Sequence, residues 1–81
     1  MEKYLTELAK GEEGTILAIH AGWGLQQRLR CLGLAEGQVI RKVSALALGG
    51  PVVVQVNRAQ VAIGRGVARR ILVSLGSVTG P

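Results

Sequence analysis

The sequence has almost no aromatic residues and few residues that crosslink or break a chain. Its 81 residues include no phenylalanine, one tyrosine, one tryptophan, one cysteine and two prolines. A hydrophobic core must therefore be built from valine, isoleucine, leucine and alanine. The single cysteine, Cys31, excludes a disulfide within the chain, which fits a reducing compartment, and we expect a cytoplasmic protein.

Long apolar runs are also missing. The longest stretch without a charge, 43–57, is interrupted by Gly49-Gly50-Pro51 and is too short and too broken for the roughly 20 apolar residues of a membrane span. The first residues lack the basic start, the apolar run and the cleavage site of a signal peptide. We therefore expect a soluble protein.

Acidic residues are absent from the second half of the chain. All five acids lie at or before Glu36, whereas six basic residues follow Gly37, and the net charge is +5. A surface built from the second half should attract an acidic protein, a nucleic acid or an anionic membrane. A basic surface that is merely solvated is the alternative interpretation.

One short segment has the pattern of a helix with a defined end. Leu25, Leu29 and Leu32 follow each other at four and three residues, which places them on one narrow helical face. Gly33 then supplies the left-handed residue that commonly ends a helix, and Leu34 can fold back as the accompanying apolar contact. We predict a short helix that lays its leucines on the core.

The rest of the sequence predicts strands. Alternating or β-branched residues indicate five of them, at 15–20, 38–44, 51–56, 59–63 and 71–75. The first is apolar on both faces and should be central. The twelve glycines argue against a helical bundle. We predict one mainly β domain over 1–75, a small closed or nearly closed barrel with one helix between its first two strands, and a frayed tail at 76–81.

Smaller features of the sequence complete this prediction. The segment 4–11 should form one helical turn or an extended lead-in that packs Leu5 and Leu8 on the core. Trp23 is expected to cover one end of the barrel. The segment 64–69 is too short and too rich in glycine for more than one loose turn.

Residues that could carry catalysis or hold a metal are scarce. His20 has no serine or cysteine placed beside it by a recognisable motif, so we expect a solvent-facing histidine. His20 and Cys31 together would supply only two of the four ligands that metal sites usually need. Gly64-Arg65-Gly66 lacks the rest of a phosphate-binding loop. We therefore predict no catalytic residue, no metal site and no cofactor.

The ordered motifs nevertheless resemble a known family. The residues that carry the resemblance are Gly14-x-Ile16-x-x-Ile19, then Leu25-x-x-Arg28-Leu29-x-x-Leu32-Gly33-Leu34-x-x-Gly37, then Leu48-Gly49-Gly50-Pro51, and last Ile71-x-Val73. In this combination the chain resembles FeoA, ferrous iron transport protein A. The resemblance implies an SH3-like barrel in the cytoplasm. It also implies partnership with the large ferrous iron permease, ferrous iron transport protein B (FeoB), whose cytoplasmic part carries a G-protein domain.

The resulting hypothesis is a non-catalytic adaptor that docks on the cytoplasmic part of the permease and modulates transport. It would be peripheral to the membrane through its partner, and a monomer or weak homo-oligomer. The candidate partner contacts are Gln27, Arg30, Arg41, Leu46, Leu48 and Arg58. Residues expected to be structural are Leu25, Leu29, Leu32, Gly33, Leu34, Gly37, Gly49 and Pro51.

Two other functions stay open at this point. A small basic barrel could bind nucleic acid along Arg41-Lys42, Arg58 and Arg65, but Tyr4 and Trp23 offer few stacking surfaces, and no nucleic-acid partner is expected. The third function is direct handling of iron, for which the chain supplies no convincing set of ligands.

Overall fold

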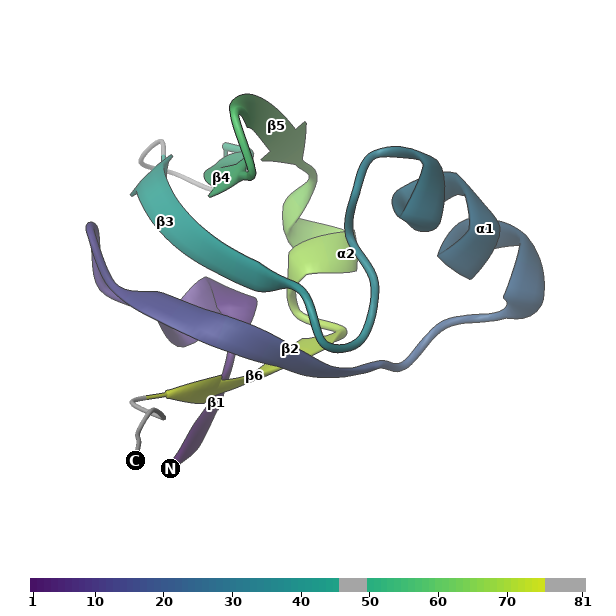
Figure 1. Cartoon of the computed structure of the whole chain (residues 1–81), viewed down its shortest axis with the longest axis horizontal. Coiled ribbons are helices and arrows are strands. Elements are labelled where there is room, and N and C mark those ends of the chain that lie inside the picture. Colours follow the sequence, from purple (N-terminus) through teal and green to yellow (C-terminus); the bar gives the residue numbers. More distant parts are fainter. Residues whose placement is uncertain (46–49, 76–81) are drawn as a thin grey trace.

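The computed structural model describes residues 1–45 and 50–75 of the chain, and within them six strands and three short helices (Figure 1). The strands are β1 (Glu2–Tyr4), β2 (Glu13–Ile19), β3 (Val39–Ala45), β4 (Val52–Val56), β5 (Ala59–Ile63) and β6 (Ile71–Leu75). The helices are the 3-10 turn η1 (Leu5–Glu7), α1 (Trp23–Cys31) and α2 (Arg65–Ala68). The expectations for Leu46, Leu48, Gly49 and the tail at 76–81 fall outside the described residues.

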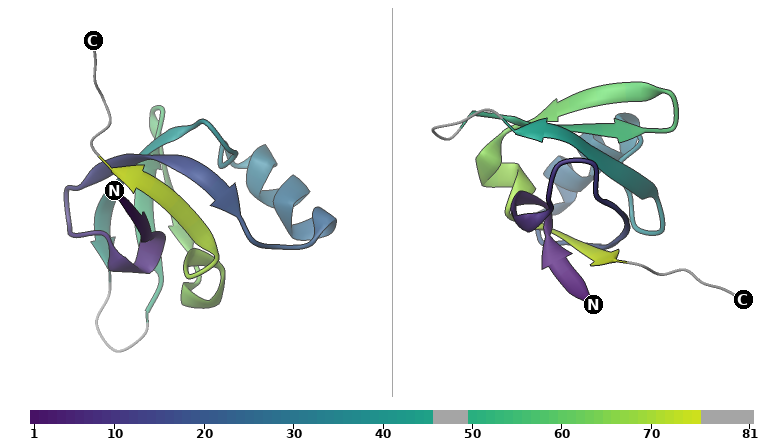
Figure 2. Two further views of the ribbon diagram at one scale, coloured as in Figure 1. Left: turned by 90° about the horizontal axis from the view of Figure 1, so that it is seen from below. Right: turned by 90° about the vertical axis from the view of Figure 1, so that its left-hand side faces the viewer.

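The six strands form one antiparallel sheet in the order β1-β6-β2-β3-β4-β5. The predicted mainly β, SH3-like architecture with a helix between β2 and β3 is confirmed. The sheet is nevertheless open, because β1 and β5 are its two edges. Figure 2 shows η1 and α2 in the space between the β3–β4–β5 layer and the β1–β6 pair, and the two helices contact each other there.

Alternation along the strands builds the core, as the sequence predicts. Val52, Val54 and Val56 of β4 are all buried, and Ile71 and Val73 of β6 face them from the other side of the fold. The central position predicted for β2 is confirmed, since it pairs with both β3 and β6. The core is aliphatic throughout.

The N-terminal segment is more ordered than the sequence predicts. Leu5 and Leu8 are buried as expected, but the residues before them form a sixth strand that pairs with β6. The backbone N–H of Tyr4 donates to Glu7 Oε1 over 2.8 Å and so caps η1. A three-residue edge strand has too little alternation for a sequence pattern to reveal it.

The helix α1 ends as predicted. Gly33 has a φ of +89°, its N–H donates to Arg30 O over 3.0 Å, and the N–H of Leu34 donates to Leu29 O over 2.9 Å. These two bonds form a Schellman motif, and Leu34 is fully buried behind it. At its other end, the N-cap of α1 is Gly22. Trp23 is 77% exposed, so the expectation that it covers an end of the barrel is wrong.

Candidate functional site

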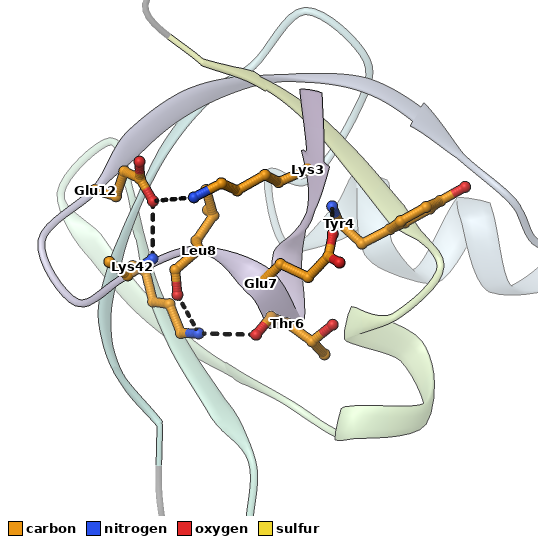
Figure 3. A network of polar contacts seen from close by, with 8 residues as sticks. Lys3, Tyr4, Thr6, Glu7, Leu8, Glu12 and Lys42 are labelled. Atoms are coloured by element: carbon orange, nitrogen blue, oxygen red, sulfur yellow. Dashed lines mark hydrogen bonds and ion pairs between the residues drawn. The ribbon is translucent and has the colours of Figure 1, made fainter. Parts of the chain in front are cut away.

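A buried lysine organises one end of the molecule. Lys42 is only 6% exposed, and its Nζ donates to Leu8 O over 2.6 Å and to Thr6 O over 3.4 Å (Figure 3). Lys42 N also donates to Glu12 O over 2.9 Å. The expectation that Lys42 could follow a phosphate backbone is therefore wrong, because its ammonium group is committed to carbonyl groups inside the fold.

Two shifted pKa values mark the same end. Burial is the main cause that lowers the pKa of Lys42; the charge of Arg65 lowers it further, and Glu12 opposes the shift. The pKa of Glu12 is lowered chiefly because its Oε1 accepts a hydrogen bond of 2.8 Å from Ala9 N–H, with help from Lys3 Nζ at 3.6 Å. We name this group, Lys3, Glu7, Glu12 and Lys42, the polar cluster.

The opposite feature is an open groove between α1, β5 and α2. It has a volume of about 320 Å³ and is mostly apolar. The groove is lined by Leu25, Arg28, Leu29, Leu32, Ala62, Ile63, Gly64 and Val67. Concave apolar surfaces with a few charged groups are where proteins usually bind partners or ligands. We call this surface the groove.

The leucine face of α1 explains why the groove is apolar. Leu29 is buried and Leu25 packs partly against the core, but Leu32 is 50% exposed. The expectation that all three leucines pack on the core therefore fails for Leu32. Besides the buried Leu29, the N-terminal part of α1 is held by the Gln26 side chain, which donates to Ala21 O over 2.8 Å and to Ile19 O over 3.1 Å.

Charge is distributed differently at the two ends. The ion pairs found among the described residues join Lys3 to Glu12 and Arg41 to Glu13, both at 3.6 Å. Arg28 and Arg30 of α1 are exposed and form no ion pair within residues 1–45 and 50–75, and the same holds for Arg58. Among the described residues, Arg28 lines the groove and no acidic residue does. The groove therefore carries one exposed arginine without an ion pair in this part of the chain.

The candidate partner contacts fall into two groups. Gln27, half-buried, and Arg30 lie on α1, and Arg58 lies in the β4–β5 turn. A Cβ added to Gly33 would lie 3.2 Å from Val56 Cγ1, so the end of α1 and the end of β4 are neighbours.

Arg41 belongs elsewhere. It is exposed on β3, while its neighbour Ile40 is buried, and it pairs with Glu13 of β2. The residues expected to be structural lie in different settings. Leu34 is buried, Gly37 has a φ of +89° in the turn before β3, and Pro51 is exposed directly before β4.

For some residues that line the groove, the sequence alone gives no sign that they belong to it. Ala62, Gly64 and Val67 come from β5, α2 and the junction between them, and only folding brings them to Leu32 and Arg28. The usable signal was Arg28, which at about 100° per residue lies beside Leu32 at the margin of the leucine face, whereas Arg30 lies on the far side of the helix.

The described residues were compared with what a metal site and a membrane-spanning helix require. Within the described part of the chain, no three His, Cys, Asp or Glu side chains are grouped so that they could hold a metal ion. His20 is exposed, and its ring centroid lies 5.9 Å from that of Tyr4. Cys31 is exposed. Among the same residues, no helix has the length and apolar character needed to cross a bilayer.

Comparison with known proteins places this geometry in a family. The family model described as the FeoA domain matches residues 3–75. A protein of Methanocaldococcus jannaschii with the provisional name Fe(2+) transport protein A is 36% identical over 64 residues, which cover 79% of this chain and 76% of that protein. The crystal structure of an iron uptake regulatory protein (FeoA) superposes with a TM-score of 0.83 at 32% identity, covering 90% of this chain and 96% of that one.

The same fold also occurs inside a larger protein. A manganese-dependent transcriptional repressor shares it with a TM-score of 0.83 at 21% identity, over 91% of this chain but only 41% of the repressor. At that identity the likeness concerns the fold alone. The family model, the archaeal relative and the FeoA crystal structure agree over nearly the whole chain, and the protein belongs to the FeoA domain family.

Proposed function

We propose that this protein is a non-catalytic adaptor of ferrous iron transport that docks on the cytoplasmic part of the ferrous iron permease, FeoB, and modulates its activity. The observation that carries the proposal is the groove, an open apolar surface that includes the exposed Arg28, on a domain of the FeoA family. Exposed apolar surface beside unneutralised charge is typical of a protein interface.

The internal use of acidic residues supports the same proposal. Glu7, Glu12 and Glu13 are engaged by backbone N–H groups or by ion pairs within the fold. The arginines of α1 have no such partner among residues 1–45 and 50–75. A partner surface that supplies carboxylates would satisfy these arginines and steer association.

The test is a binding measurement between the full 81-residue chain and the purified cytoplasmic part of the permease. We expect binding at modest ionic strength, with affinity falling as salt is raised. Nucleotide should be varied, because a G-protein domain changes its surface with the bound nucleotide. Absence of binding at low salt, with both proteins folded and each nucleotide state tried, would contradict the proposal.

A variant pair makes this test specific. Arg30→Glu reverses an exposed charge on α1, and we expect it to weaken binding several-fold. Lys10→Glu makes the same change in charge at an exposed residue outside both the polar cluster and the groove. Equal effects of the two substitutions would indicate a response to net charge alone and would argue against a contact at α1.

Nucleic-acid binding is the second candidate function, and the net charge of +5 is the observation that favours it. A basic protein that neutralises phosphates loses affinity for DNA or RNA steeply as salt rises. Lys42 is buried and cannot contribute to such a surface. A mobility-shift titration at low salt decides the matter, since no shift would remove this candidate.

A further inference from the structure

We infer that the partner binds by adding an extended strand to the free edge of β5, with alternate apolar side chains entering the groove and a carboxylate meeting Arg28. This inference rests on the proposed function and specifies how the docking takes place. Its two structural elements, the edge of β5 and the groove, are adjacent in the fold.

The edge of β5 is unprotected. Within residues 1–45 and 50–75, β5 (Ala59–Ile63) pairs with β4 alone, and its five residues include no charge and no proline. Proteins usually guard such an edge with lysine, proline or a very short strand, because its unpaired N–H and C=O groups accept a foreign strand. The other edge follows that rule, since β1 has three residues and includes Glu2 and Lys3.

The register identifies the backbone groups that are available. The two-residue turn at Asn57–Arg58 makes Val56 and Ala59 the hydrogen-bonded pair that closes the hairpin. Because such pairs alternate along an antiparallel ladder, the N–H and C=O groups of Gln60 and Ala62 point away from β4. Both residues are exposed.

The groove reaches the same edge. Successive side chains of a strand point to opposite faces, so a cavity on one face would contact only one of two neighbouring residues. The groove is lined by both Ala62, which is exposed, and Ile63, which is buried. The groove therefore includes Ala62, a residue whose N–H and C=O groups point away from β4. A strand added there would place every second side chain between β5 and Leu32 of α1.

The arginines near the groove and the β5 edge indicate what kind of segment would bind there. Arg28 is the one charged residue among those that line the groove, and the turn that leads into β5 carries Arg58. A second copy paired through its own β5 edge would bring another Arg28 and Arg58, and no carboxylate of β5, against these arginines. An extended segment with apolar residues at alternate positions and acidic residues beside them fits both the backbone edge and the arginines.

Amide exchange of the complex tests the inference directly. The probe is the purified cytoplasmic part of the permease, added to the full isotope-labelled chain, with exchange followed by NMR. We expect the amides of Gln60 and Ala62 to exchange at least about tenfold more slowly in the complex, because they become hydrogen-bonded. Docking of a helix in the groove would leave both amides fast, and that result would overturn the inference.

Matched variants test the groove itself. Leu32 and Val39 are apolar and almost equally exposed, at 50% and 48%, but only Leu32 lines the groove. Leu32→Arg should weaken binding about tenfold or more, whereas Val39→Arg, with the same added charge, should change it less than about twofold. Equal effects would overturn the assignment of the groove.

A backbone variant tests the edge. Ala62→Pro removes an N–H that points away from β4, so the hairpin can still form, and we expect the binding to fall about tenfold. Ala62→Val keeps the N–H and should bind like the parent. If Ala62→Pro fails to fold, the inference is still tested by the amide-exchange measurement and by the comparison of Leu32→Arg with Val39→Arg.

The outcomes separate this inference from the proposed function. Binding with Gln60 and Ala62 unprotected retains the adaptor function and overturns strand addition. Protection of these amides in the protein alone, increasing with its concentration, identifies a second copy as the occupant and overturns the inference. Complete absence of binding overturns the adaptor function, and the inference with it.

Discussion

The polar cluster and the groove belong to the same small domain but differ in how their side chains are used. In the polar cluster, each of the charged groups Lys3, Glu7, Glu12 and Lys42 has an internal hydrogen bond or ion pair. Around the groove, α1 contributes one buried side chain, Leu29, and leaves Leu32 half exposed.

This difference indicates which part of the molecule serves the fold and which part is free for a partner. Stability is unevenly distributed in proteins, and binding surfaces come from the less tightly packed regions. We therefore expect substitutions near the polar cluster to act through stability, and those at exposed residues of the groove to act through binding. Four predictions test this contrast, in order of decreasing expected effect.

The largest effect is expected at Gly14, where β2 and β6 approach closely next to the polar cluster. A Cβ at this position would collide with Val73 Cγ1 and would lie 2.7 Å from Ser74 O. Because the second obstacle is backbone, Gly14→Val should lower the free energy of unfolding by at least about 3 kcal/mol, measured by urea denaturation.

The control for this substitution lies in α1. A Cβ on Gly24 would meet nothing within 4 Å, and the residue is helical. Gly24→Ala should therefore stabilise the protein, by at most about 1 kcal/mol. A Gly14 variant that unfolds at the same urea concentration as the Gly24 variant would remove the contrast between the two regions.

The second prediction concerns the anchor of α1. Leu29 is 4% exposed, and Leu29→Ala should lower the free energy of unfolding by about 2 to 4 kcal/mol, because it leaves a cavity beneath the helix. Leu32→Ala, on the same face but half exposed, should change it by less than about 1 kcal/mol. Equal losses would mean that Leu32 is packed, and the groove would then not be an open surface.

Much of the fold behind this contrast could be predicted from the sequence. The features that could not be predicted depend on contacts between distant parts of the chain. The Gly33 helix end, the alternating valines of β4 and the range of β5 follow from local spacing and backbone conformation, which short stretches of sequence encode. The burial of Lys42 could not be predicted in this way, because its hydrogen-bond acceptors lie more than thirty residues earlier in the chain.

The candidate site was less predictable than the fold. Charge and polarity point to Gln27, Arg30 and Arg58 as contacts, but none of them lines the groove, which is assembled from three elements that no periodicity connects. Trp23 is expected from the sequence to cover one end of the barrel, yet it is exposed at the start of α1. Residue type predicts an average environment, whereas exposure depends on which neighbours the topology supplies.

The third prediction compares adjacent residues of β3. Lys42→Met removes the donor to Leu8 O and leaves a buried carbonyl without it, so the free energy of unfolding should fall by about 1 to 2 kcal/mol. Arg41→Met removes only an exposed ion pair with Glu13 and should change it by less than about 0.5 kcal/mol. Thermal unfolding of both variants at neutral pH would measure the difference.

The opposite result for Lys42→Met would also be informative. If this variant were more stable than the parent protein, the cost of burying the ammonium group would exceed the gain from its hydrogen bonds, as the lowered pKa of Lys42 allows. The polar cluster would then not be the reason for the stability of that end.

The smallest effect is the pH dependence contributed by Glu12. Its folded-state pKa is lowered from 4.5, so the carboxylate stabilises the fold above that value, and this contribution is lost as the pH falls through the folded-state pKa. Glu12→Gln should therefore unfold at a lower urea concentration than the parent at pH 7, and the gap should narrow in acid.

The exchange of charge for a neutral amide makes this a sensitive test of the polar cluster. Gln can still accept the Ala9 N–H but loses the ion pair with Lys3 and the extra strength of a charged acceptor. Glu2→Gln, at an exposed carboxylate with no hydrogen bond or ion pair within residues 1–45 and 50–75, should leave the urea midpoint at pH 7 almost unchanged. A gap for Glu12→Gln that stays constant down to acid would mean that its carboxylate does not stabilise the fold through charge, and the polar cluster would reduce to Lys42 and its two carbonyl acceptors.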